Sequence, residues 1–512
     1  MGFKILELKL PVGFSEEALR SQIGHLLRVG QFSFQMISQS LDARNKRNIH
    51  WLIQVGVTSD ELPGDKWQLP ELIEIPYKKR NKRIFVLGSG PAGFFAAFVL
   101  QKAGFQTTIV ERGAEVEKRS TLLKQFEKTG EFSPIANYSF GEGGAGTFSD
   151  GKLTSRSKHI SKERAFFLQT YVEAGAPAEI AWLAHPHVGS DNLRKVVTTL
   201  RNQYLQTGGS ILFETMLTDL VPEKGKVLEA ITTADSFLGD YFIMAPGHSA
   251  YETYRMLMNR GVVFRLKNFA LGSRAEHPQE LINKAQWGTE KLAGVKAAEY
   301  RLTSPGSDNI PVYSFCMCPG GVVVPATSYE GQNSVNGMSF YRRAGRYANA
   351  SCVAGIHPTR LSNSISSPLD ALAWVENLEK TFYRFSNGYR APATTINDFL
   401  KGSEAGILPA SSYPLGLVQA PLWTMLPKSI VLALRQGLKD FAQKLKGYDQ
   451  GILLGLESKT SSPIQVLRNK NGLCEGFDNL FMAGEGSGYA GGIVSSAADG
   501  IRIAMNIMEK EQ

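Results

Sequence analysis

The most informative segment of the chain is Ile84-Phe-Val-Leu-Gly-Ser-Gly-Pro-Ala-Gly-Phe-Phe-Ala-Ala-Phe-Val-Leu-Gln-Lys-Ala-Gly-Phe-Gln-Thr-Thr-Ile-Val-Glu111-Arg112. It predicts an apolar strand, a glycine-rich turn, a helix and a second strand that ends in an acid. Gly88 allows the tight turn, Gly90 lets the backbone approach a pyrophosphate, and Gly93 lets the helix pack closely on the strand. A carboxylate at Glu111 can accept hydrogen bonds from ribose hydroxyls. The segment therefore predicts a dinucleotide-binding unit.

Length and composition indicate an ordinary globular protein of several domains. The chain has 512 residues, of which 43% are hydrophobic and 20% charged, and a usual domain size of roughly 100–200 residues predicts about three domains. No apolar run approaches the roughly 20 residues of a membrane-spanning helix, and the first residues lack the apolar centre of a signal peptide. Four cysteines suit a reducing compartment. We therefore expect a cytoplasmic protein without a membrane span.

The net charge of +9 is a mild excess for a chain of 512 residues. Such an excess is more typical of solubility than of nucleic-acid binding. Its densest cluster, Lys78-Lys-Arg-Asn-Lys-Arg83, precedes the first nucleotide-binding strand. We interpret this cluster as a solvated linker, with a nucleic-acid or membrane patch as the less favoured alternative.

Four segments follow from the pattern of predicted elements. Residues 1–77 predict the order strand, helix, strand, strand, which suggests a ferredoxin-like α+β domain. Residues 78–250 form the first part of the nucleotide-binding domain, and 441–512 return to it through another strand, glycine turn and helix. Residues 251–440, with alternating strands and loops, are expected to be an inserted substrate domain.

Two further glycine segments decide between NAD, NADP and FAD. Ile243-Met-Ala-Pro-Gly247 is typical of a crossing near the adenine or pyrophosphate end of FAD, and Met482-Ala-Gly-Glu-Gly486 places a carboxylate near its ribityl chain. The helix after Gly491-Gly492 can direct its positive dipole end to the flavin N1–C2=O edge. We therefore predict an α/β fold: a discontinuous Rossmann-type FAD-binding domain, an inserted α+β substrate domain and a small N-terminal ferredoxin-like α+β domain.

A third glycine-rich loop, Gly141-Glu-Gly-Gly-Ala-Gly146, would let the backbone pass close to the isoalloxazine or pyrophosphate; a lid that touches nothing is the alternative. Asp150 and Lys152 after it either orient the flavin or a substrate carboxylate, or lie on the surface. The residues predicted to bind the cofactor are Gly88, Gly90, Pro91, Ala92, Gly93, Glu111, Arg112, Gly143, Gly144, Ala145, Gly146, Ala245, Gly247, Gly484, Glu485, Gly491, Gly492 and Ile493.

Long strings along the chain carry a resemblance to a known family. They are Ser40-Leu-Asp-Ala-Arg44, the stretch from Ser139 to Leu153, Ala245-Pro-Gly-His-Ser-Ala250, Glu276-His-Pro-Gln279, Ser314-Phe-Cys-Met-Cys-Pro-Gly-Gly321, Asn336-Gly-Met-Ser339 and the stretch from Gly484 to Ile493. In them the chain resembles the FAD-dependent (NAD/FAD-utilising) dehydrogenases of the glutathione-reductase-like flavoprotein superfamily. The resemblance implies FAD and redox chemistry but names no substrate. Lys459 departs from it, because an arginine is expected there and lysine lacks the bidentate fork.

Four residues are candidates for proton transfer: His248, Glu276, His277 and Tyr489. His248 follows the Ala-Pro-Gly turn and Tyr489 lies in the last glycine-rich turn, so both are expected near the cofactor. A histidine there is often a hydrogen-bonding fixture instead. Glu276 and His277 lie in the inserted region, which is expected to cover the reactive face of the flavin.

Cys316-Met-Cys318 suggests either a redox dithiol or two buried cysteines on a strand that lines the active cavity. We favour buried cysteines, because a C-x-C bridge is strained. The other two cysteines, Cys352 and Cys474, lack the C-x-x-C spacing of a metal site. No metal is expected.

We predict a FAD-dependent oxidoreductase that transfers a hydride between flavin N5 and an unidentified small-molecule substrate. The chain has no second G-x-G-x-x-G fingerprint, so NAD(P)H, if it is the donor, would dock transiently at the inserted region. The alternatives are an RNA-modifying flavoprotein and a non-catalytic protein with structural FAD. Nucleic acid is the less favoured partner, and the sequence gives no oligomeric state.

Overall fold

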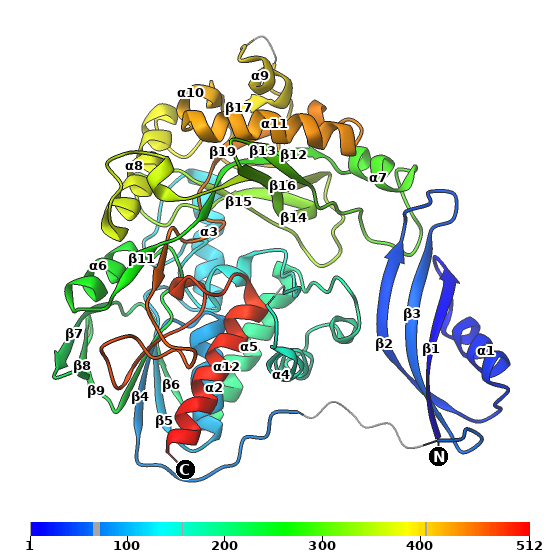
Figure 1. Ribbon diagram of the computed structural model, residues 1–512, viewed down its shortest axis with the longest axis horizontal. Coiled ribbons are helices and arrows are strands. Elements are labelled where there is room, and N and C mark those ends of the chain that lie inside the picture. The colour runs from blue at the N-terminus through cyan, green and yellow to red at the C-terminus, as the bar shows by residue number, and fades with distance from the viewer. Residues whose placement is uncertain (1, 65–71, 156, 405–406, 512) are drawn as a thin grey trace.

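The computed structural model describes residues 2–64, 72–155, 157–404 and 407–511. Three units are visible in Figure 1: an N-terminal unit on the right, a nucleotide-binding unit at the lower left and an inserted unit across the top. The beginning and the end of the chain lie in different units, since the last helix returns to the nucleotide-binding unit.

The N-terminal unit is one antiparallel sheet covered by one helix. Its elements are β1 (Gly2–Pro11), α1 (Glu16–Leu27), β2 (Ser33–Asp42) and β3 (His50–Ser59), and the strand order is β1-β3-β2. This is the predicted order of elements, and it matches the first four of the six elements of a ferredoxin-like fold. The second helix and fourth strand of that fold do not occur in the described part of residues 2–77, so the unit lacks the last two elements of the expected fold.

The nucleotide-binding unit is built on a five-stranded parallel sheet of order β21-β10-β4-β5-β6. Its strands are β4 (Arg83–Leu87), β5 (Gln106–Val110), β6 (Ser210–Leu212), β10 (Tyr241–Met244) and β21 (Leu480–Met482). Because β21 pairs with β10, the end of the chain completes the sheet that residue 83 begins. This pairing agrees with a discontinuous domain.

Helices cover this sheet and bury its central part. They are α2 (Pro91–Lys102), α3 (Val116–Thr129), α4 (Ser161–Glu173), α5 (Ser190–Gln206), α6 (Tyr251–Asn259) and α12 (Ile493–Lys510). Nearly all of α2 is apolar and buried, as expected of a helix enclosed on every side. Helix α12 packs so closely on α2 that a Cβ at Gly500 would lie 2.0 Å from the carbonyl oxygen of Ala92. A small antiparallel ribbon of β7 (Leu217–Glu223), β8 (Lys226–Thr232) and β9 (Ser236–Leu238) lies at the edge.

The inserted unit contains a large mixed sheet of order β13-β14-β16-β12-β19-β17-β18, with β15 paired to β14. Its strands are β12 (Phe269–Pro278), β13 (Thr303–Ser307), β14 (Ile310–Pro325), β15 (Val335–Met338), β16 (Tyr347–Ile356), β17 (Ala391–Thr395), β18 (Leu417–Gln419) and β19 (Ile452–Glu457). Strand β19 lies beyond residue 440, so the sheet continues past the point at which the sequence suggested that the insertion ends. A two-stranded ribbon of β11 (Phe264–Leu266) and β20 (Ile464–Val466) joins this unit to the nucleotide-binding unit.

Five α-helices of the described residues also belong to this unit, in addition to the strands and loops expected there. They are α7 (Gln279–Trp287), α8 (Pro368–Ser386), α9 (Ile396–Lys401), α10 (Leu422–Met425) and α11 (Lys428–Lys444). Helix α11 lies along the sheet at the top of Figure 1 and buries Ile430, Leu434, Leu438 and Phe441. These helices enclose a hydrophobic core on the outer side of the sheet. The other side of the sheet faces the nucleotide-binding unit.

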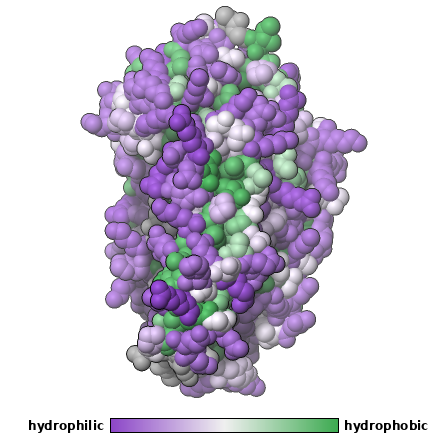
Figure 2. Space-filling view, turned by 90° about the vertical axis from the view of Figure 1, so that its right-hand side faces the viewer, coloured by the Kyte–Doolittle hydropathy of each residue, from purple (hydrophilic) through white to green (hydrophobic). Residues whose placement is uncertain are grey.

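Figure 2 shows apolar side chains gathered in the middle of the face that the N-terminal unit occupies. Ile5 and Leu26 of this unit are exposed. Within the described ranges, no helix combines the length and the apolarity that crossing a bilayer requires.

Candidate functional site

Three glycine-rich turns meet at the carboxyl ends of β4, β10 and β21, the edge at which open parallel sheets bind ligands. Gly88 has a φ of +93°, and a Cβ on it would lie 2.3 Å from the carbonyl oxygen of Ala245. A Cβ on Gly93 would lie 2.0 Å from the carbonyl oxygen of Gly88. Side chains at these two positions are therefore excluded by the packing of the first turn against its neighbours.

Four other glycines face open space, and we call them the glycine cradle: Gly90, Gly247, Gly491 and Gly492. A Cβ at Gly247, Gly491 or Gly492 would meet no described protein atom within 4 Å, and one at Gly90 would meet only the Cα of Gly144, at 3.7 Å. Gly90 and Gly492 are also the N-caps of α2 and α12, and neither end has a side-chain cap. Exposed backbone and two positive helix ends fit a pyrophosphate-bearing cofactor.

Glu111 lies at the predicted place, at the end of β5. Its buried carboxylate accepts hydrogen bonds from Ser89 N (3.0 Å), Ser89 Oγ (2.8 Å), Gly113 N (2.9 Å) and Gly141 N (3.0 Å). The carboxylate thus joins the first glycine turn to the loop at 141–146. Contact with a ribose remains a prediction.

Replacing Ser89 with alanine should lower the free energy of unfolding by about 1.5 kcal/mol, because it removes one charge-assisted hydrogen bond to Glu111. The backbone bond from Ser89 N remains, so the turn should keep its shape. Urea denaturation of the two proteins measures the difference. Ser157→Ala, on an exposed loop, is the matched control and should change stability by less than about 0.5 kcal/mol; equal losses would contradict the prediction.

The loop at 141–146 is fastened to the cradle. Arg119, fully buried on α3, donates to the carbonyl oxygens of Asn137 (2.9 Å), Glu142 (3.0 Å) and Gly144 (2.8 Å). A Cβ on Gly144 would lie 3.1 Å from the Cα of Gly90. The loop is therefore held in place and is not the contact-free lid of the alternative interpretation.

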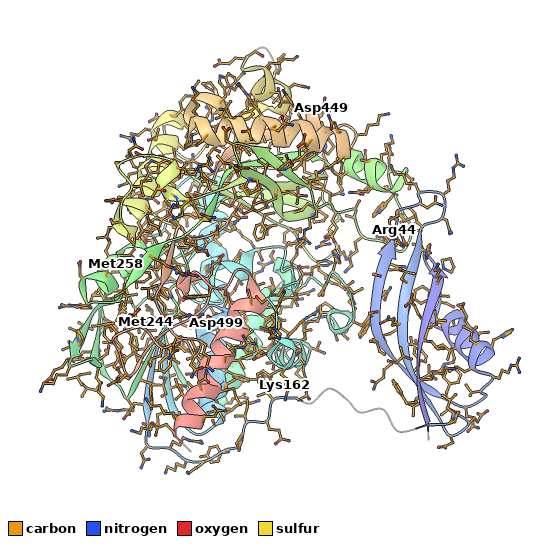
Figure 3. The ribbon with its side chains drawn as sticks, in the orientation of Figure 1. Arg44, Lys162, Met244, Met258, Asp449 and Asp499 are labelled. Carbon is orange, nitrogen blue, oxygen red and sulfur yellow. The ribbon has the colours of Figure 1, made fainter. Side chains whose placement is uncertain are left out.

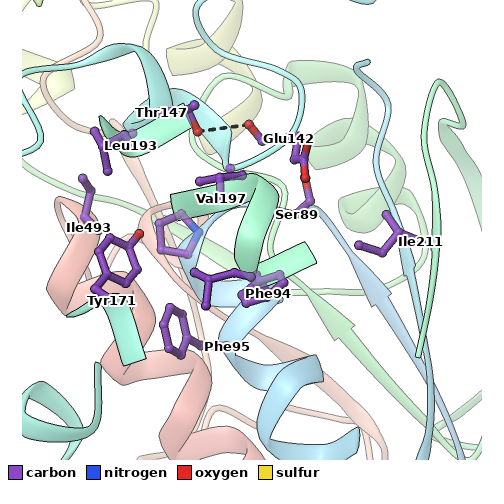
Figure 4. A pocket seen from close by; sticks show the side chains of 14 residues that line it. Ser89, Phe94, Phe95, Glu142, Thr147, Tyr171, Leu193, Val197, Ile211 and Ile493 are labelled. Atoms are coloured by element: carbon purple, nitrogen blue, oxygen red, sulfur yellow. Dashed lines mark hydrogen bonds between the residues drawn. The ribbon is translucent and has the colours of Figure 1, made fainter. Parts of the chain in front are cut away.

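A small apolar pocket lies beside the cradle and behind this loop (Figure 4). Pro91, Gly146 and Ile493 line it on the cradle side, and Glu142 contributes its one acidic group. Glu142 accepts hydrogen bonds from Val116 N (2.8 Å) and Arg201 Nη1 (2.9 Å), and its Oε1 has no hydrogen-bond partner among the described residues. Burial raises the pKa of Glu142 to about 7, so this acid can exchange a proton near neutral pH.

His248 is the candidate for proton transfer that adjoins the cradle. Its Nδ1 lies 3.5 Å from Glu485 Oε2, and its buried Nε2 has no hydrogen-bond partner in the described ranges. The Tyr254 hydroxyl holds this region together, since it lies 2.8 Å from Gly247 O and 2.9 Å from Gly486 O. Asp499 of α12, labelled in Figure 3, accepts from Gly484 N at 2.8 Å and fixes the last glycine turn.

The other three candidates have partners outside the cradle. Glu276 accepts from Ser412 N, and burial raises its pKa. His277 is fully buried on β12, with Nε2 2.7 Å from Tyr448 O, and burial lowers its pKa to about 4. Tyr489 is exposed, with its ring 4.5 Å from the guanidinium carbon of Arg468. The structure thus groups His248 with the glycine turns and holds Glu276 and His277 inside the inserted unit.

A buried charge cluster near the loop was not recognised from the sequence. Asp150 is fully buried and accepts from Arg343 Nη2 (2.6 Å) and Lys152 Nζ (2.8 Å). Although burial opposes it, these two cations hold the pKa of Asp150 well below its usual range. Asp150 is therefore not a surface residue. Arg343 carries no sequence signal, because it meets Asp150 only through the fold.

Two further predicted positions have protein partners. Arg112 pairs with Glu252, and its guanidinium carbon lies 3.9 Å from the centre of the Phe140 ring. Lys459, where the resemblance leads us to expect arginine, is buried with Nζ 2.9 Å from Glu379 Oε1. Lys459 Nζ also donates to the Tyr251 hydroxyl at 2.9 Å, so two separate protein groups share its charge. Among the described residues, no three His, Cys, Asp or Glu side chains are grouped so that they could hold a metal ion.

Comparison with known proteins identifies a family and several similar proteins. A family model described as "FAD-dependent protein, C-terminal domain-like" matches residues 268–460. An uncharacterized protein of Clostridium beijerinckii is 37% identical over 497 residues, which cover 93% of this chain and 92% of that protein. Among solved structures, CtdE in complex with FAD is 11% identical, with 84% of each chain covered and a TM-score of 0.36. Glycine oxidase from Bacillus cereus is also 11% identical, with 84% and 96% covered and a TM-score of 0.33.

Proposed function

The chain belongs to the family of FAD-dependent proteins and its cofactor is FAD, and we therefore propose that it is an oxidoreductase acting on a small molecule. The reaction is a hydride transfer between flavin N5 and an unidentified substrate. The observation that carries the proposal is the glycine cradle, because four glycines and two uncapped helix ends leave open backbone beside His248.

Each part of the site has a task in holding the cofactor. Gly90 and the first turn of α2 would hold the pyrophosphate, Glu111 the adenosine ribose, and Glu485 the ribityl chain. The loop at 143–146 and Ile493 would line the flavin ring. When bound, FAD supplies a ring system that accepts or donates a hydride.

The residues of the chain provide the electrostatic setting. The uncapped N-terminal end of α12 stabilises negative charge that develops close to it. His248 Nε2 lacks a protein partner among the described residues and is the atom proposed to exchange a proton with the substrate, while Glu485 Oε2, 3.5 Å from Nδ1, orients the ring. His248 is thereby the residue proposed to move the substrate proton.

An anaerobic absorbance spectrum before and after addition of NADH or NADPH tests the proposal. We expect flavin bands in the purified protein and their bleaching by one of the two nucleotides. Bleaching by a reduced substrate but by neither nucleotide would identify the substrate, and not NADH or NADPH, as the electron donor. Bands that neither nucleotides, candidate substrates nor dithionite reduce readily would overturn the enzymatic proposal in favour of structural FAD.

His248→Gln should keep the bound FAD and slow the reductive step at least about tenfold, as expected for loss of a proton-transferring group. His357→Gln is the matched control, since His357 contacts Thr359 in the inserted unit, away from the cradle. Stopped-flow absorbance measures both. An unchanged rate in His248→Gln would show that His248 does not transfer a proton in the reductive step.

A further inference from the structure

Two cysteines of β14 lie at an irregularity of the large sheet. Cys316 has a φ of +45°, in the left-handed region that residues other than glycine rarely adopt. The register between β14 and β16 shifts between Phe315 and Cys318, as at a bulge. Such irregularities re-aim side chains, so the usual strand geometry does not describe this pair.

The irregularity brings the thiol of Cys318 to residue 316. Cys318 Sγ donates a hydrogen bond to the carbonyl oxygen of Cys316 at 3.3 Å. Both cysteines are free thiols. Cys318 is fully buried, whereas Cys316 is partly exposed.

Two cations stand next to this pair. Arg274, fully buried, has Nη2 2.8 Å from Cys316 O and 3.5 Å from Cys318 Sγ. Lys152 donates to the carbonyl oxygen of Met317, between the cysteines. Lys152 also follows the loop that ends at Gly146, so the pair adjoins the chain segment that reaches the cradle.

The surroundings give the two thiols different acidities. The neighbouring Cys318 thiol, with the charges of Arg274 and Lys152, lowers the pKa of Cys316 to about 7 against burial. The pKa of Cys318 is raised by the same contact and by burial. Cys352 and Cys474 are also buried, and burial raises the pKa of each to about 12, although Tyr448 opposes the rise at Cys352 and Arg468 opposes it at Cys474. Cys316 is therefore the thiol suited to nucleophilic attack, and its neighbour Cys318 is suited to react in a second step. Cys352 and Cys474 serve as unreactive controls in the same chain.

We propose that Cys316 and Cys318 form a thiol–disulfide exchange site for a disulfide of low molecular weight. Cys316 is the attacking thiol and Cys318 the resolving thiol. This activity goes beyond the proposed flavin reaction and needs no electrons from FAD. It also replaces the interpretation of the pair as inert buried cysteines.

The reaction has two balanced steps. The Cys316 thiolate attacks one sulfur of the substrate disulfide; a Cys316–substrate S–S bond forms, the substrate S–S bond breaks, and one thiolate leaves and takes up a proton. Cys318 then loses its proton and attacks Cys316 Sγ, which forms the Cys316–Cys318 disulfide and releases the second substrate thiol. The substrate gains two electrons, the pair loses two, and a dithiol reductant in solution resets the pair.

Alkylation of the intact, FAD-loaded protein by iodoacetamide, read out by peptide mass spectrometry, tests the acidity of Cys316. The thiolate fraction rises as pH rises through the pKa, so the rate at Cys316 should have a midpoint near pH 7, below the value of about 8.5 for a free cysteine. At pH 7 it should exceed the rates at Cys352 and Cys474 at least tenfold. Equal rates at the three residues would overturn the proposal.

Exposure to oxidised glutathione tests the exchange itself. The wild-type protein should release two equivalents of reduced glutathione and lose two hydrogens between residues 316 and 318. Cys318→Ser should stop with glutathione bound to Cys316, Cys316→Ser should do neither, and Cys352→Ser should behave as wild type. Glutathione retained by Cys316→Ser, or no bound glutathione in Cys318→Ser, would overturn the assignment. The flavin spectrum, recorded in parallel, separates this result from failure of the flavin proposal.

Discussion

Replacing Gly90 with valine should leave a folded protein that no longer retains FAD. Gly90 has a φ of −66°, which any residue adopts, and a Cβ there would meet only the Cα of Gly144, at 3.7 Å. The branched side chain would instead fill the space at the α2 N-terminus, where the pyrophosphate is expected to bind. We expect FAD affinity to fall at least 100-fold, about 3 kcal/mol, as measured by flavin content after purification and by titration of the apoprotein.

Two variants separate this effect from general damage. Gly90→Ala should weaken FAD binding less than valine does, because its single methyl group fills less of the same space. Gly30→Val, in the N-terminal unit with its nearest neighbour Glu61 Oε1 at 3.8 Å from the added Cβ, should retain FAD fully. A Gly90→Val protein that purifies with full yellow colour would contradict the assignment of the cradle.

The local part of this architecture follows from the sequence because its determinants are neighbours in the chain. The strand, glycine turn and helix between residues 84 and 102 lie where the pattern predicts them. Helix α5 likewise ends at Gln206, just before Gly208 and Gly209, because glycine is a local signal for the end of a helix. Elements of this kind can be predicted without knowing which distant residues they contact.

The remaining features depend on contacts that the chain makes only after folding. Asp150 and Arg343 are 193 residues apart, and nothing in either local sequence indicates the other. His277 and Glu276 are adjacent, yet successive side chains of a strand face opposite sides of the sheet. His277 therefore packs on Tyr448 while Glu276 contacts Ser412, away from the cradle. Cys316 is a similar case, because its positive φ comes from the sheet and not from a turn sequence.

A deeply buried ion pair of the inserted unit joins Arg274 of β12 to Glu457 of β19. Arg274 Nη1 lies 2.9 Å from Glu457 Oε2, and the two side chains are 0% and 1% exposed. Arg274 Nε also donates to Asn349 Oδ1 at 2.7 Å. The same guanidinium reaches the cysteine pair, so its position links the stability of the sheet to the acidity of Cys316.

Replacing Glu457 with leucine should lower the free energy of unfolding by about 3–5 kcal/mol, because Arg274 would keep a buried charge without its counter-ion. Glu457→Gln should cost less, since its amide oxygen still accepts a hydrogen bond. Glu163→Leu removes the acid of the more exposed pair with Arg502 and should cost at most about 1 kcal/mol. Urea denaturation with saturating FAD measures all three. The double variant Arg274→Met with Glu457→Leu should lose less stability than the sum of the single variants; strict additivity would show that the two charges do not depend on each other.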